Sequence, residues 1–386
     1  MVLYFWYLFQ AIIGYNLIFP MMLYVLHLFK TKKIIRVDPL EENNFDYGII
    51  VTAYEQTDLL TSVVDSILRL EYSNYLIYVV ADNCDISNLS FDNDRVILLR
   101  PESVLANNVR SHLYAIDHFK REHNLLTIID SDNIVDPNYL KELNFFFNDG
   151  YQAVQGVREA KNLNSVYACL DAARDIYYHF YDGQLLFDLG SSATLSGSGM
   201  AFTTALYKEC FSTVNFSGAG FDKVLQAQIL RKGLRIAFAK KAIVYDEKTA
   251  QTDQLVNQRS RWINTWFKYF KYGFEILWNG IKNFNLNQFL FGVVLVRPPL
   301  FMFILVSLLC AGINLVINPL ITLIWIIALG IFILSFYISL RKSSTDARIY
   351  RSLINIPKFI YFQLVSLVHS RQANKRSVAT KHHINS

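Results

Sequence analysis

Three long apolar segments frame this chain, one at its start and two near its end. They cover residues 1–29, where no Lys or Arg precedes Lys30, then Pro298–Ile317 and Pro319–Leu340. An α-helix needs about 20 apolar residues to cross the hydrocarbon core of a bilayer, so each segment is long enough for one span. The first has neither the basic start nor the small-residue cleavage site of a signal peptide, so we interpret it as a retained anchor. The Asn318-Pro319 link predicts a tight turn between the last two spans.

The residues between these segments alternate between strand-like and helix-like patterns. Apolar runs of the buried-strand kind predict strands at residues 47–51, 76–80, 96–99 and 125–129, and amphipathic patterns predict helices at 59–70 and 109–120. Such alternation favours an α/β fold with a mostly parallel sheet covered by helices. Ligands of these sheets bind beyond the carboxyl ends of the strands, where Asp82 and Asp130 fall.

Further helical patterns follow. Residues 164–187 predict a long helix whose apolar face is broken by Asp171, Arg174 and Asp175. Residues 251–284 mix aromatic rings with lysines, which suits a helix at the level of the lipid headgroups, with packing into a core as the alternative.

The segment Leu286–Val296 is too short to span a membrane and is expected to lie in the interface or to extend the next helix. Arg297 follows it, and a cation at the centre of a membrane helix costs about 2.5–3.5 kcal/mol. We expect its side chain either to reach lipid headgroups or to contact an acceptor or phosphate.

Composition fits a globular domain joined to membrane segments. Of 386 residues, 53% are hydrophobic and 18% are charged, which is apolar for a soluble enzyme and too polar for a pure membrane bundle. The net charge is +5, and the basic residues cluster beside apolar segments. This pattern indicates contact with anionic lipid and diphosphate, and argues against nucleic acid as a partner. The four cysteines have no paired metal-site spacing, which favours a reducing cytosol.

The basic clusters also predict an orientation. Lys30, Lys32, Lys33 and Arg36 follow the first span, and Arg341, Lys342, Arg348 and Arg351 follow the third. Because basic loops stay in the cytoplasm, we expect a multi-pass protein of the inner (plasma) membrane with its middle part cytoplasmic. The expected parts are an anchor at 1–30, a cytoplasmic domain ending in an interfacial helix at 31–285, a transmembrane hairpin at 286–341, and an interfacial helix with a basic tail at 342–386.

Two groups of carboxylates are candidates for chemistry. Asp130 and Asp132 flank one residue at a strand end, so both can face one site, although Asp-Ser-Asp-Asn is also a common turn. Mg²⁺ or Mn²⁺ is commonly held by one or two carboxylates together with substrate phosphates. Asp222 begins an amphipathic run, where it is a helix cap or a general base, and the sequence alone favours the cap.

Gln258, Arg261 and Trp262 are spaced three and four residues apart, so on a helix they share a face. Arginine offers two parallel donors to a phosphate, and tryptophan offers a flat surface to a sugar ring or a nucleobase. A helix on the membrane surface is the alternative. In residues 195–200 the Gly-x-Ser-x-Gly spacing of a hydrolase is absent, and the small residues let a substrate approach the backbone.

The order of these elements resembles the family 2 glycosyltransferases over roughly residues 46–285. The elements are Thr52-Ala53-Tyr54-Glu55, Asp82-Asn83, Asp130-Ser131-Asp132, Gly197-Ser198-Gly199, Phe221-Asp222 and Gln258-x-x-Arg261-Trp262. The chain looks most like the membrane-bound branch with cellulose, chitin and hyaluronan synthases and bacterial exopolysaccharide transferases. This resemblance implies a Rossmann-like GT-A domain with a mostly parallel mixed sheet, about three transmembrane helices and interfacial helices.

The resemblance also implies roles. It assigns nucleotide-sugar binding to Ala53, Tyr54, Glu55, Asp82, Asp130 and Arg110, with Asp82 at the uracil edge, and Mg²⁺ or Mn²⁺ to Asp132 and Asp130. Asp222 is the implied base, and the implied groups for acceptor and diphosphate are Gly197, Ser198, Gly199, Gln258, Arg261 and Trp262. The implied reaction is inverting transfer from a nucleotide sugar, expected to be UDP-linked, to a growing polysaccharide or glycan at the cytoplasmic face.

The chain departs from the family pattern at several points. Glu55-Gln56 stands for Asn-Glu, Phe221-Asp222 for Glu-Asp, and Asn107-Asn108-Val109-Arg110 has no Gly-Lys, so that Arg110 is expected to supply the charge. Three spans are fewer than polymer-extruding synthases carry, which leaves room for export subunits as partners. The alternatives are transfer of one sugar to a lipid carrier and a non-catalytic membrane subunit. A wide aromatic groove would favour the polymer, and a hydrophobic slot open to the bilayer would favour the lipid.

Overall fold

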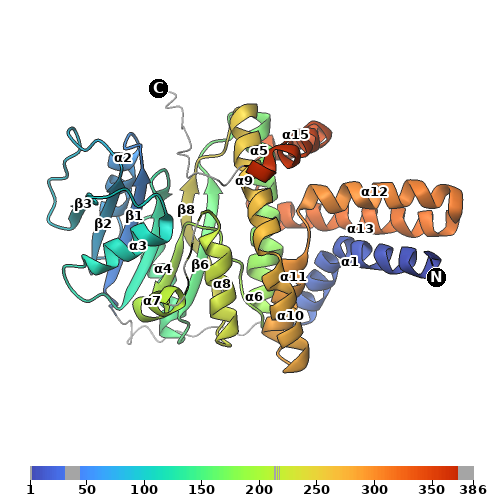
Figure 1. Cartoon of the computed structure of the whole chain (residues 1–386), viewed down its shortest axis with the longest axis horizontal. Helices are drawn as coiled ribbons and strands as arrows, with labels where there is room; N and C mark the ends of the chain where they lie inside the picture. The colour runs from blue at the N-terminus through green and yellow to red at the C-terminus, as the bar shows by residue number, and fades with distance from the viewer. Residues whose placement is uncertain (1, 31–43, 213, 215, 217, 373–386) are drawn as a thin grey trace.

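The structure, a computed structural model, describes residues 2–30, 44–212, 214, 216 and 218–372. A sheet domain lies against a layer of helices, and three long helices project from that layer (Figure 1). The predicted basic cluster at Lys32, Lys33 and Arg36, and the basic tail at 373–386, lie outside the described residues.

One mixed sheet forms the centre of the domain, with the strand order β3-β2-β1-β4-β7-β6-β8-β5. The strands are β1 (Tyr47–Tyr54), β2 (Tyr75–Asp82), β3 (Val96–Leu99), β4 (Leu125–Asp130), β5 (Ile134–Val135), β6 (Ala153–Ala160), β7 (Met200–Thr203) and β8 (Ile236–Asp246). The first four strands and β6 with β8 pair in parallel, whereas β7 runs antiparallel to β4 and β6, and β5 to β8. The four predicted strands are confirmed, and the carboxyl ends of β1, β2 and β4 meet at one edge.

Helices cover both faces of this sheet, as the alternating pattern predicted. One face carries α2 (Leu60–Leu68) and α4 (Tyr139–Asn148), and the other carries α3 (Asn108–Asp117), α7 (Thr204–Ser212) and α8 (Phe221–Arg231). In α2 the buried residues Leu60, Val63, Val64 and Ile67 recur at helical spacing. The sheet therefore has an apolar core on each side, and β1 is buried along Tyr47–Val51.

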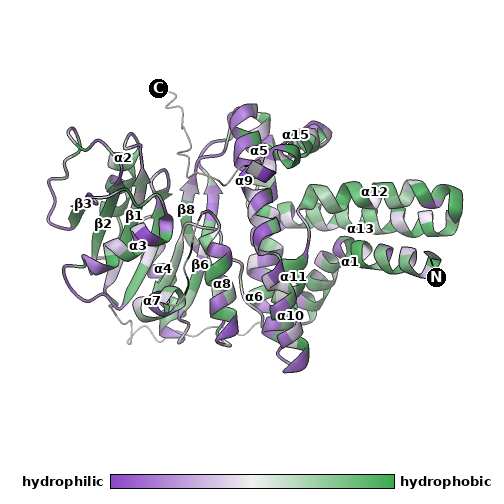
Figure 2. Ribbon diagram, in the orientation of Figure 1, coloured by the Kyte–Doolittle hydropathy of each residue, from purple (hydrophilic) through white to green (hydrophobic). Residues whose placement is uncertain are grey.

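The three apolar segments form the helices α1 (Val2–Phe29), α12 (Leu300–Ile317) and α13 (Pro319–Lys342). All three are long and apolar enough to cross a membrane, as predicted. Figure 2 shows hydrophobic colour along nearly the whole of α12 and α13. Gln10 of α1 fixes the bundle, because its Oε1 accepts hydrogen bonds from Asn314 Nδ2 at 2.5 Å and Trp325 Nε1 at 2.7 Å.

The helical layer between the sheet and the spans consists of α5 (Val166–Tyr178), α6 (Leu186–Asp188), α9 (Thr252–Tyr269), α10 (Lys271–Lys282), α11 (Leu286–Val296), α14 (Ala347–Ser352) and α15 (Ile356–His369). The predicted long helix at 164–187 is present, with a π-helical turn at His179–Leu185 between α5 and α6. α11 does not extend α12. It packs beside α10 (Figure 1), because Pro298 and Pro299 lie between α11 and α12.

Candidate active site

A cavity of about 1750 Å³ opens at the carboxyl ends of β1, β2 and β4 and continues toward α12, α13 and α15. Most of the site residues predicted from the sequence line it: Ala53, Tyr54, Glu55, Asp82, Asp130, Asp132, Gly197, Asp222, Gln258, Arg261 and Trp262. They come from six separate parts of the fold, namely the ends of β1, β2 and β4, the loop before β7, and the helices α8 and α9.

At the β1 and β2 end of the cavity the backbone is unusual. Glu55, Asn83 and Ala106 adopt left-handed conformations with φ of 60°, 54° and 44°. Non-glycine residues pay for such conformations with strain, which concentrates at ligand sites. Asp82 is buried, and its carboxylate oxygens accept hydrogen bonds from the backbone N–H groups of Leu105 at 2.9 Å and Ala106 at 2.7 Å. Asp82 therefore shapes the loop over this end as well as lining it.

Asp130 and Asp132 lie where β4 ends. The Ser198 hydroxyl oxygen accepts a hydrogen bond from Asp130 N–H at 3.0 Å, which fixes this turn. Burial, and next the charge of Asp132, raise the pKa of Asp130 to about 7, although Arg158 opposes them. Two carboxylates that repel each other in this way have unmet negative charge, which a divalent cation would neutralise.

Metal binding by the protein alone is not supported. Within the described part of the chain, no group of three or more His, Cys, Asp or Glu side chains could hold a metal ion. The pair Asp130 and Asp132 instead fits the mode in which Mg²⁺ or Mn²⁺ takes one or two carboxylates and completes its shell with substrate phosphates and water.

Asp222 is not a helix cap. The N-cap of α8 is Gly220, with φ 90°, and no side chain caps this helix. Asp222 Oδ2 lies 3.0 Å from Lys223 Nζ, and its charge contributes to the raised pKa of Asp130. The interpretation as a cap, which the sequence alone favoured, is therefore wrong, and the carboxylate is left facing the cavity near the Asp130 pair.

A buried network of charges stands behind these carboxylates, and its members on β6 and β8 were not predicted. Arg158 pairs with Asp246 at 2.8 Å, and Lys248 pairs with Asp246 at 2.7 Å and with Asp175 at 2.5 Å. Burial would raise the pKa of Asp175, but Lys248 and Arg174 outweigh it and hold that pKa well below its usual range. The one sequence signal was the break in the apolar face of α5.

α9 places Gln258, Arg261 and Trp262 on the cavity, as their spacing predicted. The neighbouring Arg259 was missed: it is buried and pairs with Asp171. The guanidinium carbons of Arg174 and Arg259 lie 4.3 and 4.2 Å from the centre of the Trp262 ring. This ring, 38% exposed, is thus partly occupied by arginines, which reduces the flat surface expected for a sugar.

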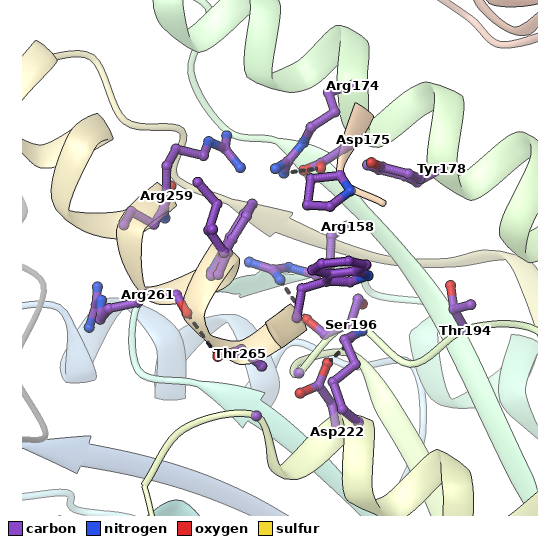
Figure 3. Close-up of a pocket in the computed structure, with 18 of the residues that line it drawn as sticks. Arg158, Arg174, Asp175, Tyr178, Thr194, Ser196, Asp222, Arg259, Arg261 and Thr265 are labelled. Carbon is purple, nitrogen blue, oxygen red and sulfur yellow. Dashed lines mark hydrogen bonds and ion pairs between the residues drawn. The ribbon is translucent and has the colours of Figure 1, made fainter. Parts of the chain in front are cut away.

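Figure 3 shows how these side chains are arranged. Arg174 and Asp175 lie beside Tyr178, and the Arg261 side chain points away from them. Arg158 donates a hydrogen bond to the Ser196 carbonyl at 2.7 Å, so it also holds the Gly197 loop in place.

Three predicted residues do not belong to the cavity lining. Arg110 is exposed, because α3 turns Val109 and His112 toward the core and Arg110 to the opposite side. Ser198 is fully buried behind the strand ends, where its hydroxyl contacts Asp130 N–H and Asn133. Gly199 packs against Val244. Ser198 and Gly199 therefore lie behind the cavity wall and support it from there.

Arg297 does not reach out to lipid headgroups. It is 7% exposed, lines the cavity and forms an ion pair with Asp182 of the π-helical turn. The first of its two expected roles is therefore wrong.

The sequence model described as "Glycosyltransferase like family 2" matches residues 45–265. Among solved structures, the mannosyltransferase PcManGT from Pyrobaculum calidifontis, in complex with GDP-Man and Mn²⁺, aligns with a TM-score of 0.55 and 12% identity, over 94% of this chain and 96% of that one. TarS 1-349 from S. aureus aligns with a TM-score of 0.43 and 17% identity, over 85% and 90%. No curated protein matches this chain.

At such identities the likeness to PcManGT is one of fold. Together with the family match it identifies the mixed, Rossmann-like sheet as a GT-A fold, so the predicted fold class is confirmed.

Proposed function

Because this chain belongs to the family 2 glycosyltransferases, we propose that it transfers a sugar from a nucleotide sugar to a glycan acceptor at the cytoplasmic face of a membrane. One observation carries the proposal. Asp130, Asp132 and Asp222 face one cavity with Gln258 and Arg261, although they are far apart in sequence, which supports donor, metal and acceptor roles at a single site. A scaffold without turnover needs no isolated carboxylate facing that cavity.

In this proposal the nucleotide lies over β1 and β2, beside Ala53, Tyr54 and Glu55. Asp130 and Asp132 would hold Mg²⁺ or Mn²⁺, which neutralises charge on the leaving diphosphate. Arg261 supplies further donors to the phosphates from α9. The neighbour PcManGT was solved with GDP-Man and Mn²⁺, which supports a donor of this class and a divalent metal. We propose a UDP-sugar as donor, and a test must include GDP-sugars.

Asp222 is the proposed base. Its carboxylate accepts the proton of the acceptor hydroxyl while that oxygen attacks the anomeric carbon. The bond from this carbon to the diphosphate oxygen breaks, and its electron pair leaves with the nucleoside diphosphate. Attack from the side opposite the leaving group inverts the anomeric configuration. Lys223 Nζ, 3.0 Å from Asp222 Oδ2, holds this carboxylate in position.

The test is release of nucleoside diphosphate by the chain in lipid nanodiscs, across UDP- and GDP-sugars with Mn²⁺ or Mg²⁺. We expect release with one donor, and a loss of at least 100-fold in Asp222→Asn, because a general base contributes about 10²–10⁴-fold. Nucleotide affinity should stay unchanged. Asp65→Asn, at an exposed carboxylate of α2, is the matched control and should keep wild-type release.

Substantial release by Asp222→Asn would disprove the base assignment. Nucleotide binding without release from any donor would instead favour the alternative of a non-catalytic subunit.

A further inference from the structure

The cavity does not end at the charged groups of the GT-A domain. It continues along a slot of aliphatic and aromatic side chains from α12, α13 and α15. This slot is lined by Leu300, Phe301, Ile304, Leu308, Leu329, Phe332, Ile333, Phe336, Tyr337, Ile356, Phe359 and Ile360. One space therefore joins the carboxylates at the strand ends to two of the helices that are apolar enough to cross a membrane.

The slot opens sideways. Leu308 is 51% exposed and Ile333 is 67% exposed, yet both line the cavity. The outer surface of these spans faces lipid in a bilayer, so the slot is accessible from the hydrocarbon region. Transfer of an apolar chain into it needs no passage through water.

The slot also stops partway. At 1.5 Å per residue, Leu308 lies about 12 Å along α12 from Leu300, and Leu329 about 20 Å along α13 from Lys342. The hydrocarbon core is about 30 Å thick. No described residue of α1, and none of residues 309–328, lines the cavity. The described cavity thus suits the chain of a lipid in one leaflet, and it is no channel across the membrane.

A cationic cluster marks the junction between the slot and the polar part. Five cations pair there with four carboxylates: Arg158, Arg174, Lys248, Arg259 and Arg297 with Asp171, Asp175, Asp182 and Asp246. All five cations are held by carboxylates that are fixed in the fold, so the cluster is pre-organised.

Arg297 is the member nearest the slot, since Pro298 and Pro299 alone separate it from α12. One of its terminal nitrogens pairs with Asp182, whereas the other, Nη1, is buried without a hydrogen-bond partner among the described residues. Arg174 Nε and Arg259 Nη1 are likewise buried without a hydrogen-bond partner among the described residues. Unpaired buried guanidinium N–H groups are costly, and a bidentate anion such as phosphate would satisfy them.

Building on the proposed function, we propose that the acceptor is a glycan joined through phosphate to a membrane lipid. The phosphate binds at Arg297 with Arg174 and Arg259, the hydrocarbon chain lies in the slot, and a sugar hydroxyl reaches Asp222. The slot fits the lipid alternative that the sequence left open. The guanidinium groups fix the lipid head at the membrane surface, which holds the acceptor sugar at the base.

The test is thermal unfolding of the purified chain in detergent with three probes: farnesyl phosphate, farnesol and inorganic phosphate. A ligand that binds only the folded state raises Tm in proportion to its occupancy. We expect a rise with farnesyl phosphate, and a shift of less than a third of that with either other probe, because chain and phosphate bind together.

Two variants locate the effect. Ile333→Trp fills the opening of the slot and should lose the farnesyl phosphate shift, whereas Leu334→Trp, 52% exposed on the same helix but outside the slot, should keep it. The double variant Arg297→Gln with Asp182→Asn removes both charges together, so no buried ion is left unpaired, and it should lose the shift as well.

Donor binding serves as the internal reference. Every variant is also tested with UDP or GDP and Mn²⁺, and this shift should persist in Ile333→Trp. If neither UDP nor GDP with Mn²⁺ raises the Tm of the wild type, that result counts against the proposed function. The farnesyl phosphate result is then interpreted separately, as evidence on lipid binding alone. The lipid proposal is overturned when wild type responds equally to farnesyl phosphate and farnesol, or when Ile333→Trp keeps the full shift.

Discussion

The residue before Asp222 is Phe221, where the family pattern has a glutamate, and it packs against the buried ring of His112. His112 is fully buried, its Nδ1 lies 2.7 Å from the Tyr207 hydroxyl, and its ring meets the edge of Phe221 with centroids 5.1 Å apart. Burial lowers the pKa of His112 to about 3. A glutamate at position 221 would lie in this apolar core beside an uncharged imidazole, so phenylalanine suits the site better.

This imidazole predicts an acid-sensitive fold. Unfolded His112 takes up a proton near pH 6.5, whereas the native chain takes it up only near pH 3, so stability falls as pH drops between these values. The slope is about 1.4 kcal/mol per pH unit for one proton. The difference in free energy of unfolding between wild type and His112→Gln is first measured at pH 8 as the reference. Between pH 6 and pH 4 this difference should shrink by about 1.4 kcal/mol per pH unit. Chemical unfolding in detergent measures it, and parallel curves for the two proteins would contradict the assignment.

At the scale of residues, the sequence predicted the groups that stand in ordered motifs at strand ends and on one helix face. Asp130, Asp132 and Arg261 stand in such motifs, and all three line the cavity. It missed Arg259, whose partner Asp171 lies 88 residues away, and Lys248, which joins the nearby Asp246 to Asp175, 73 residues away, because pairing over such separations has no local pattern. Arg110, which it assigned to the donor, lies on the exposed side of α3 and outside the cavity lining.

Among the elements, the α10–α11 pair depends on close packing at glycine. A Cβ at Gly292 would lie 2.5 Å from the Leu277 backbone nitrogen and 2.6 Å from its Cα, whereas a Cβ at Gly312 of α12 would meet nothing within 4 Å. Both glycines are helical, so alanine improves helix propensity by a similar amount, about 0.8–1.0 kcal/mol. The two sites therefore differ in the room that each leaves for a methyl group.

Gly292→Ala should therefore destabilise the chain, and Gly312→Ala should not. Pushing the two helix backbones apart costs about 1–3 kcal/mol, which exceeds the gain in propensity. We expect a lower Tm for the first variant and an equal or higher Tm for the second in the same detergent. Equal Tm values would show that α11 is free to move away from α10, and that this contact does not hold the layer beneath the site.

The hydrophobic pattern predicted where most helices and strands lie along the chain, but it predicted less well which of them pack against each other. The three apolar segments became helices within a few residues of their predicted ends, because length and composition decide a span. The return of α11 onto α10 was not foreseen, since it depends on shape at Gly292 and on Pro298 and Pro299. The π-helical turn that places Asp182 opposite Arg297 left no periodicity to detect.

At the scale of the whole molecule, one cavity joins the GT-A domain to the apolar helices. The cavity crosses that junction, with carboxylates at the sheet end, arginines in the middle and apolar side chains along α12 and α13. The sequence predicted both ends separately. Their continuity required the fold, because the lining comes from residues as far apart as Thr52 and Gln363.

The orientation of this assembly is open to a direct test. The domain lies at the end of the bundle where α1 finishes at Phe29 and α13 at Lys342, and the α12–α13 turn lies at the other end (Figure 1). Basic residues at the domain end predict that this side is cytoplasmic.

The native cysteines are all buried, so an introduced one can be labelled selectively. A membrane-impermeant maleimide on intact cells should label Val316→Cys, 88% exposed beside the turn, and should label Ser344→Cys only after permeabilisation. The reverse result would place the carboxylate site outside the cell, away from cytoplasmic nucleotide sugars, and would overturn the proposed topology.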